Sequence, residues 1–172
     1  FNSLSKLVDE HKINGVNNIT PSYNKLIISF DLSVTNYSKI RKIILDLKVN
    51  NEINNDHKKI KIPVCCDDEF GLDFNRLSDK TKLSKEEIIE LYLNNEYFCY
   101  MTGFIAGMPF LGDINKDIRC DRLETPRVKV PKGSVGITEQ FTNIYTFESP
   151  GGWNIIGNTP QKVFDRSNLD EP

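Results

Sequence analysis

The densest run of helix-breaking residues in this chain lies between residues 125 and 160. Five of the ten glycines and four of the eight prolines fall there. Because glycine and proline break helices and set turns, this segment is predicted not to be helical. Short β-branched and aromatic runs, such as residues 144–147 and 153–156, stand between the breakers. Short strands with regularly spaced turns are typical of a β-barrel or sandwich.

The chain before this segment shows helical and strand periodicities. Apolar residues at helical spacing predict a helix over residues 3–11, and alternation predicts strands over 16–19 and 26–30. Asn36 is placed to cap a helix with an apolar stripe from Ile40 to Leu47. This order predicts a small α+β lobe over residues 1–55. Residues 49–59, rich in Asn, Asp and Lys, are predicted to be an exposed linker into a second domain, residues 56–172.

Charge and composition exclude several classes of partner. The 22 basic and 24 acidic residues give a net charge of −2, so we expect no nucleic acid partner. No apolar run approaches the roughly 18 residues of a membrane helix, so we expect no membrane insertion. The four cysteines (Cys65, Cys66, Cys99 and Cys120) form no C-x-x-C pair, and both histidines lie far from them in sequence. We therefore predict free thiols in the reducing cytoplasm and no metal site.

Arg127 is the first candidate for binding chemistry. It lies between a proline turn and a strand, where its guanidinium could clamp a carboxylate, carbamate or phosphate through two hydrogen bonds. The alternative is a structural salt bridge, for example to Glu148. Lys129 would share the face of Arg127 if the strand is regular, which would make a modest anion-binding pair.

The turn at residues 149–153 is the second candidate. The backbone amides of Ser149, Gly151 and Gly152 could form a nest for an anion. Trp153, the only tryptophan, is either a packing residue or a platform for a ligand. Glu148 is placed to act as an acid or base. No histidine follows residue 57, so a Ser-His-Asp or Cys-His set is excluded here unless the N-terminal lobe folds back over the barrel.

Two long motifs carry a resemblance to a known family. PRVKVPKGSVGI (residues 126–137) and FESPGGWNIIGNTP (residues 147–160) resemble the cyclophilin-like domain of the family of KipI and the 5-oxoprolinase B subunit, also called allophanate hydrolase subunit 1. Its pattern comprises the carboxyltransferase subdomains C and D, and the match extends through residues 62–73 and 100–113. The resemblance implies an α+β, mainly β fold: a small α+β lobe, lacking an N-terminal strand here, followed by a cyclophilin-like closed β-barrel.

The resemblance implies an activity and partners. The chain is similar to a subunit of the bacterial ATP-dependent 5-oxoprolinase, which would open 5-oxoproline to glutamate. The partners would be a KipA-like protein (allophanate hydrolase subunit 2) and a third protein of the complex, with the active cleft shared between subunits. The complex would use ATP, this chain would not bind it alone, and it would be inactive alone. The alternatives are a KipI-like inhibitor of a sensor histidine kinase and a component of a urea- or allophanate-pathway amidohydrolase.

The resemblance also singles out residues and departures. Glu69 matches an acidic position of the pattern and is a candidate catalytic carboxylate; a solvated turn is the alternative. Thr142 matches the QTGIYP motif and is a candidate for substrate binding. The chain departs from this motif at Phe141, Asn143 and Thr146, and Asn158 replaces an arginine. If the family residues at these positions contact the substrate, this chain is predicted to bind a different ligand or to bind the same ligand more weakly. Glycines at positions 103, 107 and 112 could let the loop at residues 104–110 approach a ligand or partner closely; the alternative is that this loop folds over the barrel.

Overall fold

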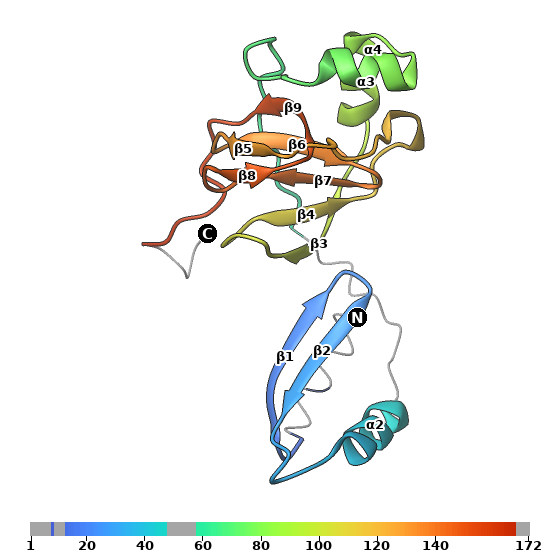
Figure 1. Ribbon diagram of the computed structural model, residues 1–172, viewed down its shortest axis with the longest axis vertical. Helices are drawn as coiled ribbons and strands as arrows, with labels where there is room; N and C mark the ends of the chain where they lie inside the picture. The colour runs from blue at the N-terminus through green and yellow to red at the C-terminus, as the bar shows by residue number, and fades with distance from the viewer. Residues whose placement is uncertain (1–7, 9–12, 48–57, 168–172) are drawn as a thin grey trace. The chain divides into compact units, whose positions relative to one another are not determined.

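The computed structural model describes Val8 and residues 13–47 and 58–167 (Figure 1). The chain divides into two compact units, residues 1–59 and residues 60–172. The predicted boundary at residue 55 lies outside the described residues, as do most of the linker and, apart from Val8, the helix expected over residues 3–11.

The first unit contains a β-hairpin and a helix. Strands β1 (Val16–Ser22) and β2 (Lys25–Phe30) pair in antiparallel fashion around a tight turn in which Tyr23 has a φ of 32°. Helix α2 (Tyr37–Asp46) follows, and its first turn is capped by Asn36, whose side chain accepts from the backbone N–H of Lys39 at 3.0 Å. The predicted order of strand, strand and capped helix is confirmed.

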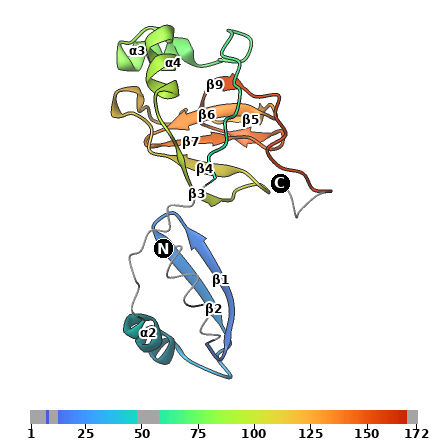
Figure 2. The ribbon, with the colours of Figure 1, turned by 180° about the vertical axis from the view of Figure 1, so that it is seen from behind.

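The second unit is built on an antiparallel five-stranded sheet. Its order is β3 (Phe98–Thr102), β4 (Pro109–Gly112), β7 (Phe141–Ile144), β6 (Ser134–Thr138) and β9 (Asn154–Asn158). Strand β6 is buried along its whole length. A single bridge between Cys65 and Asn158 extends the sheet beyond β9. The five strands lie side by side from both directions of view (Figures 1 and 2).

The remaining two strands form a ribbon of their own. Strand β5 (Arg127–Val130) pairs only with β8 (Ser149–Gly151) among the described strands. The chain is therefore mixed and mostly sheet, as predicted. However, the hydrogen bonds of the described strands do not close a ring, since β3 and β9 remain the two ends of the five-stranded sheet. The closed barrel is thus not found here, because β5 and β8 pair with each other instead of joining the ends.

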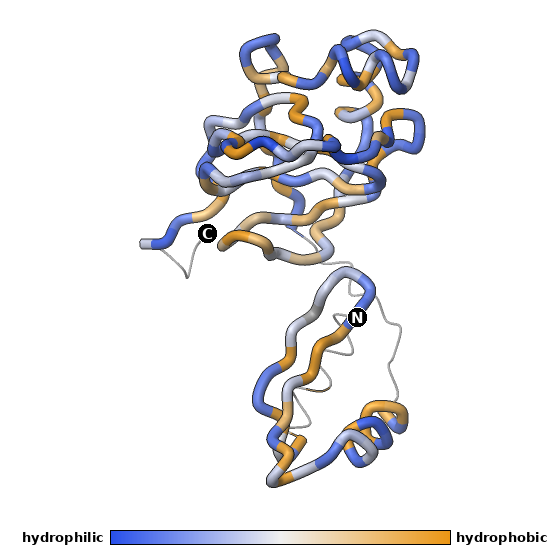
Figure 3. Tube along the Cα trace, in the orientation of Figure 1, coloured by the Kyte–Doolittle hydropathy of each residue, from blue (hydrophilic) through white to orange (hydrophobic). Residues whose placement is uncertain are grey.

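Two helices pack on this sheet near β9 (Figures 1 and 2). Helix α3 (Phe74–Thr81) and helix α4 (Lys85–Leu93) bury their apolar sides against the sheet, and Figure 3 shows hydrophilic and hydrophobic residues alternating along them. A capping box starts α4, where Ser84 and Glu87 bond reciprocally; the S-x-x-E spacing in the sequence is the signature of this motif. A short 3₁₀ turn, η1 (Lys116–Ile118), adds Ile118 to the same core.

Candidate functional site

Arg127 on β5 is held by a carboxylate from the start of α3. Its Nη2 donates to Asp73 Oδ1 at 2.7 Å. The Asp73 side chain is 6% exposed and that of Arg127 is 28% exposed, so the ion pair is largely shielded from water. The salt-bridge interpretation of Arg127 is therefore correct, but the partner is Asp73 and not Glu148.

Asp73 also ties α3 to the last strand of the sheet. Its Oδ2 accepts from the backbone N–H of Ile155 at 2.6 Å, and its own N–H donates to Ile155 O at 3.0 Å. Asp73 stands at the N-cap position of α3, yet its side chain makes no capping hydrogen bond. The carboxylate is instead used by Arg127 and β9, which lie far from it in sequence.

Lys129 and Glu148 form a separate, exposed pair. Their Nζ and Oε1 atoms lie 3.1 Å apart, and the side chains are 74% and 57% exposed. Strand β5 is not regular, because its register against β8 shifts between Arg127 and Val130. Lys129 is thus paired with a carboxylate rather than with Arg127, and an anion-binding pair of these two cations is not formed. Glu148 remains a predicted acid or base, in a well-solvated position.

The register of the ribbon places one face of it over Tyr145. Arg127 stands opposite Gly151, and Val130 stands opposite Ser149. Paired residues, and residues two apart on one strand, project to the same side. A methyl group at Gly151 would lie 2.2 Å from the Tyr145 hydroxyl oxygen, so this side is the one that covers Tyr145. Gly151 is therefore required for close packing of the ribbon on the tyrosine ring.

Tyr145 is a buried residue with cationic neighbours. It is 1% exposed and packs with Met108, Val130 and Ile155. Burial raises the pKa of its hydroxyl, while the Asn143 amide and the guanidinium groups of Arg122 and Arg127 oppose that rise. Burial is the larger effect, so the net pKa of this hydroxyl is raised and the neutral, protonated form is favoured.

Gly152 and Trp153 complete this end of the ribbon. The Gly152 carbonyl accepts from the Leu123 N–H at 2.8 Å. Trp153 is 9% exposed, and its ring meets Phe110 edge to face with the centroids 5.5 Å apart. The packing interpretation of Trp153 is supported, since so little of the ring is left for a ligand to stack on.

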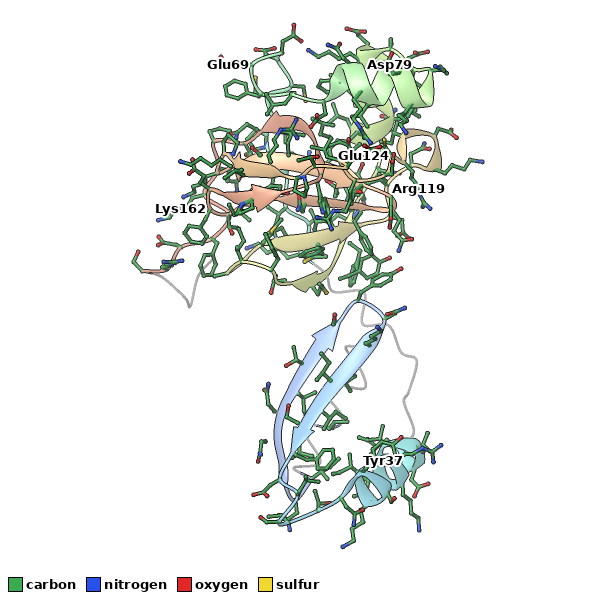
Figure 4. All side chains as sticks on the ribbon, viewed as in Figure 1. Tyr37, Glu69, Asp79, Arg119, Glu124 and Lys162 are labelled. Carbon is green, nitrogen blue, oxygen red and sulfur yellow. The ribbon has the colours of Figure 1, made fainter. Side chains whose placement is uncertain are left out.

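The other two predicted site residues lie elsewhere. Glu69 is exposed in the turn before α3 (Figure 4). Thr142 is fully buried: its hydroxyl lies 2.8 Å from that of Tyr92 and donates to Gly136 O at 3.0 Å. Thr142 is a core residue in this structure, so a direct substrate contact has no support from its geometry.

The four cysteines are free thiols, and burial raises the pKa of Cys66, Cys99 and Cys120. Within residues 13–47 and 58–167, no group of three or more His, Cys, Asp or Glu side chains is arranged to hold a metal ion. None of the described helices has the length and apolarity needed to span a bilayer.

Comparison with known proteins shows the family to which this chain belongs. A family model described as carboxyltransferase domain, subdomain C and D, matches residues 1–172. The chain belongs to this carboxyltransferase family. The B subunit of 5-oxoprolinase from Bacillus subtilis (strain 168) is 41% identical over 126 residues, which cover 73% of this chain and 50% of that protein. The protein of the same name from Haemophilus influenzae is 37% identical over 153 residues, covering 89% and 68%.

A solved structure supports the same assignment. The crystal structure of TTHA0988 superposes with a TM-score of 0.81 at 26% identity, covering 98% of this chain and 33% of that one. The carboxyltransferase chain thus spans about half the length of its Bacillus subtilis relative.

The departures of this carboxyltransferase chain from its family pattern fall in two places. Asn143 replaces a glycine and is fully buried beside Tyr145. Asn158 replaces an arginine and lines a pocket of about 340 Å³ together with Lys132 and Lys162. Sequence reasoning finds these substitutions but misses Tyr145, which lies beside Asn143 and lines the same pocket as Asn158. The available signal is the motif over residues 141–146, in which the tyrosine is retained.

Different residues of the loop at residues 104–110 agree with each of its two predicted roles. Met108 is 2% exposed and packs on Tyr145, which agrees with a loop that folds over the sheet. Phe104, in contrast, is 68% exposed and adopts a φ of 68°, in the left-handed region. Gly107, with the same φ, allows the Phe164 ring to lie directly against its backbone. The carboxyltransferase chain therefore presents one large aromatic side chain to solvent on an otherwise packed loop.

Proposed function

We propose that this chain is part of a subunit of an ATP-dependent 5-oxoprolinase. The enzyme opens the lactam of 5-oxo-L-proline to give L-glutamate, coupled to the hydrolysis of ATP to ADP and phosphate. One water molecule is consumed in opening the lactam and a second in hydrolysing ATP. The observation that carries this proposal is the 41% identity to the Bacillus subtilis protein named as the B subunit of 5-oxoprolinase.

The chemistry of the candidate site supports a shared active cleft. Residues 58–172 contain no histidine, so a nucleophile activated by an imidazole is not available within the second unit. Arg127 and Tyr145 supply cationic and hydrogen-bonding groups, whereas Glu69 and Glu148 are exposed and separate. This half-set of groups fits a protein that binds substrate and meets the remaining catalytic groups on a KipA-like partner, with a third protein completing the complex.

ATP is proposed to bind elsewhere in the complex. The sequence contains no Walker-type phosphate loop. Titration calorimetry with ATP should therefore detect no binding to the isolated full-length protein, and saturable binding to the complete complex.

The decisive experiment reconstitutes the complex from its separately purified proteins. ATP hydrolysis and glutamate formation are measured with 5-oxo-L-proline, with L-proline as the control, and with each protein omitted in turn. Turnover that requires both 5-oxo-L-proline and this protein supports the proposal. Turnover that persists without this protein, or its absence from every mixture, contradicts it.

One observation favours a second candidate function. Phe104 is a large aromatic side chain exposed on a structured loop, which is typical of an anchor for another protein. A KipI-like inhibitor of a sensor histidine kinase would use such an anchor. If kinase autophosphorylation falls on addition of this protein but not of its Phe104→Ser variant, the inhibitor function is supported. A gene for a KipA-like protein beside this one would favour the enzyme instead.

A further inference from the structure

The pocket of about 340 Å³ beside Asn158 is lined by none of the residues that sequence reasoning predicts for the site. Its volume is near the lower end of the range of about 300–1,000 Å³ that is usual for small-molecule sites. Lys132 and Lys162 both line it, and no aspartate or glutamate does so among the described residues. The pocket is therefore sized for a small ligand, and the charged residues of its lining are all positive.

Hydrogen bonds between the turn before β6 and the segment after β9 fix the walls of this pocket. Asn158 Nδ2 donates to Lys132 O at 2.9 Å, and the Thr159 N–H donates to Gly133 O at 2.9 Å. Gly133 has a φ of 83°, and a methyl group there would lie 2.4 Å from Thr159 O. The two segments are thus closely packed, and the walls are in place before a ligand binds.

Positive charge exceeds negative charge around this pocket. Lys162, on the segment after β9 (Figure 4), pairs with Asp165, whereas Lys132 forms no ion pair within the described part of the chain. Lys132 Nζ lies 5.9 Å from the centroid of the Phe147 ring, and the Arg166 guanidinium carbon lies 4.4 Å from the same centroid. Three cations and one carboxylate leave two net positive charges here, although the whole chain has a net charge of −2.

This local charge matches a dianion better than a monoanion. A phosphate monoester carries close to two negative charges at about pH 7, because its second pKa is about 6, whereas a carboxylate carries one. Lysine ammonium groups bind phosphate oxygens as point charges. The nearby pair of Lys129 and Glu148 adds no net charge.

The rest of the lining is suited to an organic group, since Ile144, Pro160 and Val163 contribute to it. We propose that this pocket binds a small phosphate monoester. The phosphate lies against Lys132 and Lys162, and the organic group lies against the apolar part of the lining. This site is additional to the proposed function and does not depend on it.

The first test compares two ligands of similar shape and different charge. Phenyl phosphate is close to a dianion at about pH 7.5, whereas phenyl sulfate is a monoanion. Titration calorimetry on the full-length protein in dilute salt should show saturable binding, with phenyl phosphate at least about tenfold tighter than phenyl sulfate. Inorganic phosphate should bind more weakly than phenyl phosphate, because it lacks the organic group.

Two results would overturn the proposal at this stage. One is equal affinity for phenyl phosphate and phenyl sulfate, or heats that do not saturate. The other is tighter binding of a phosphoserine peptide than of phenyl phosphate, which would assign the pocket to a phosphorylated protein instead.

Lysine variants test the assigned contacts. Lys132 and Lys162 are exposed, so Lys132→Gln and Lys162→Gln remove a charge without disturbing the core. Each should weaken phenyl phosphate by about fivefold or more. Lys129→Gln is the matched control, because Lys129 is also an exposed, paired lysine but does not line the pocket. Its Kd should stay within about twofold of the wild type. Equal losses in all three variants would show only general charge attraction and would overturn the site.

Asp165→Asn should strengthen binding. The change removes the carboxylate that pairs with Lys162, while the asparagine can still accept from the Ser167 N–H and hydroxyl, which Asp165 Oδ1 meets at 2.9 and 2.7 Å. Phenyl phosphate should bind about threefold or more tightly, since Lys162 is released to the ligand. Unchanged or weaker binding would contradict the placing of the phosphate on Lys162.

Discussion

The Arg127 guanidinium and the Asp73 carboxylate meet at 2.7 Å although 54 positions separate them along the chain. The pair joins the β5–β8 ribbon to the start of α3. Asp73 in turn holds the N–H of Ile155 on β9. One carboxylate therefore fixes the place of the candidate binding residue relative to the sheet.

Asp73→Ala should be strongly destabilising. It leaves the Arg127 charge partly buried without its partner and removes an acceptor from Ile155. Loss of one partner costs about 3–5 kcal/mol for a fully buried pair. Because Arg127 is 28% exposed, we expect about 2–3 kcal/mol from urea unfolding. Glu148→Ala breaks the exposed pair with Lys129 and should cost less than about 1 kcal/mol. Similar costs for the two variants would contradict the assigned difference in burial.

Gly151→Ala should loosen the ribbon from Tyr145. The added methyl group would overlap the tyrosine hydroxyl, and overpacking of this kind costs about 1–3 kcal/mol. Gly152→Ala is the control, because its methyl group would meet its nearest neighbours at 3.4–3.5 Å, including the flexible Arg122 side chain. Urea unfolding should show the larger loss for Gly151→Ala, with part of it recovered by a second change, Tyr145→Phe. No recovery would show that the clash is not with the hydroxyl.

Stability should fall in alkaline solution through Tyr92. Burial raises its pKa from 10.0 to about 12, so the folded state keeps the proton that the unfolded state loses. The stabilisation is complete below about pH 10 and is lost as the pH rises toward about 12. Urea midpoints measured from about pH 8 to about 11.5 should fall more steeply for the wild type than for Tyr92→Phe. The slope is diagnostic, because Tyr92→Phe also removes the hydrogen bond to Thr142 at every pH. Parallel slopes would assign the alkaline loss to other groups.

Phe104→Gly should not lower stability, despite the loss of a whole aromatic ring. The residue is largely exposed and has a positive φ, which costs a non-glycine residue about 1–2 kcal/mol. We expect a gain of up to about 1 kcal/mol in the free energy of unfolding. Phe104→Ala keeps the strained backbone and should show no such gain. A clear loss with both variants would mean that the ring packs on the protein in solution.

Local structure is readable from this sequence, whereas long-range pairing is not. The Asn36 cap, the Ser84–Glu87 capping box and the short strands around glycine and proline depend on neighbours within a few residues, so spacing alone predicts them. Arg127 is recognisable as a charged binding or salt-bridge residue for the same reason. Its partner is not, because nothing in the sequence near Asp73 distinguishes a cap from a carboxylate that reaches β5 and β9.

The candidate site shows the same limit. Lys129 is expected beside Arg127 only if the strand is regular, and a register shift in β5 separates them. Thr142 belongs to a motif that predicts a substrate contact, yet its hydroxyl bonds to Tyr92 inside the core. Sequence reasoning misses Tyr145 because its packing depends on Gly151 and Gly136. These glycines have no side chain to crowd the tyrosine ring, and only the fold places them next to it.

The attachment of residues 65–76 to the last strand has a consequence for synthesis. Cys65 bridges Asn158, Asp73 binds Ile155, and Arg76 bonds to Asn154. Residues 65–76 therefore reach their native positions only after the ribosome has released β9, because the strand that they bind is synthesised late. Contacts this distant in sequence are slow to form. A nascent chain stopped before β9 should expose the apolar faces of α3 and α4, and such fragments should be prone to aggregation and to capture by chaperones.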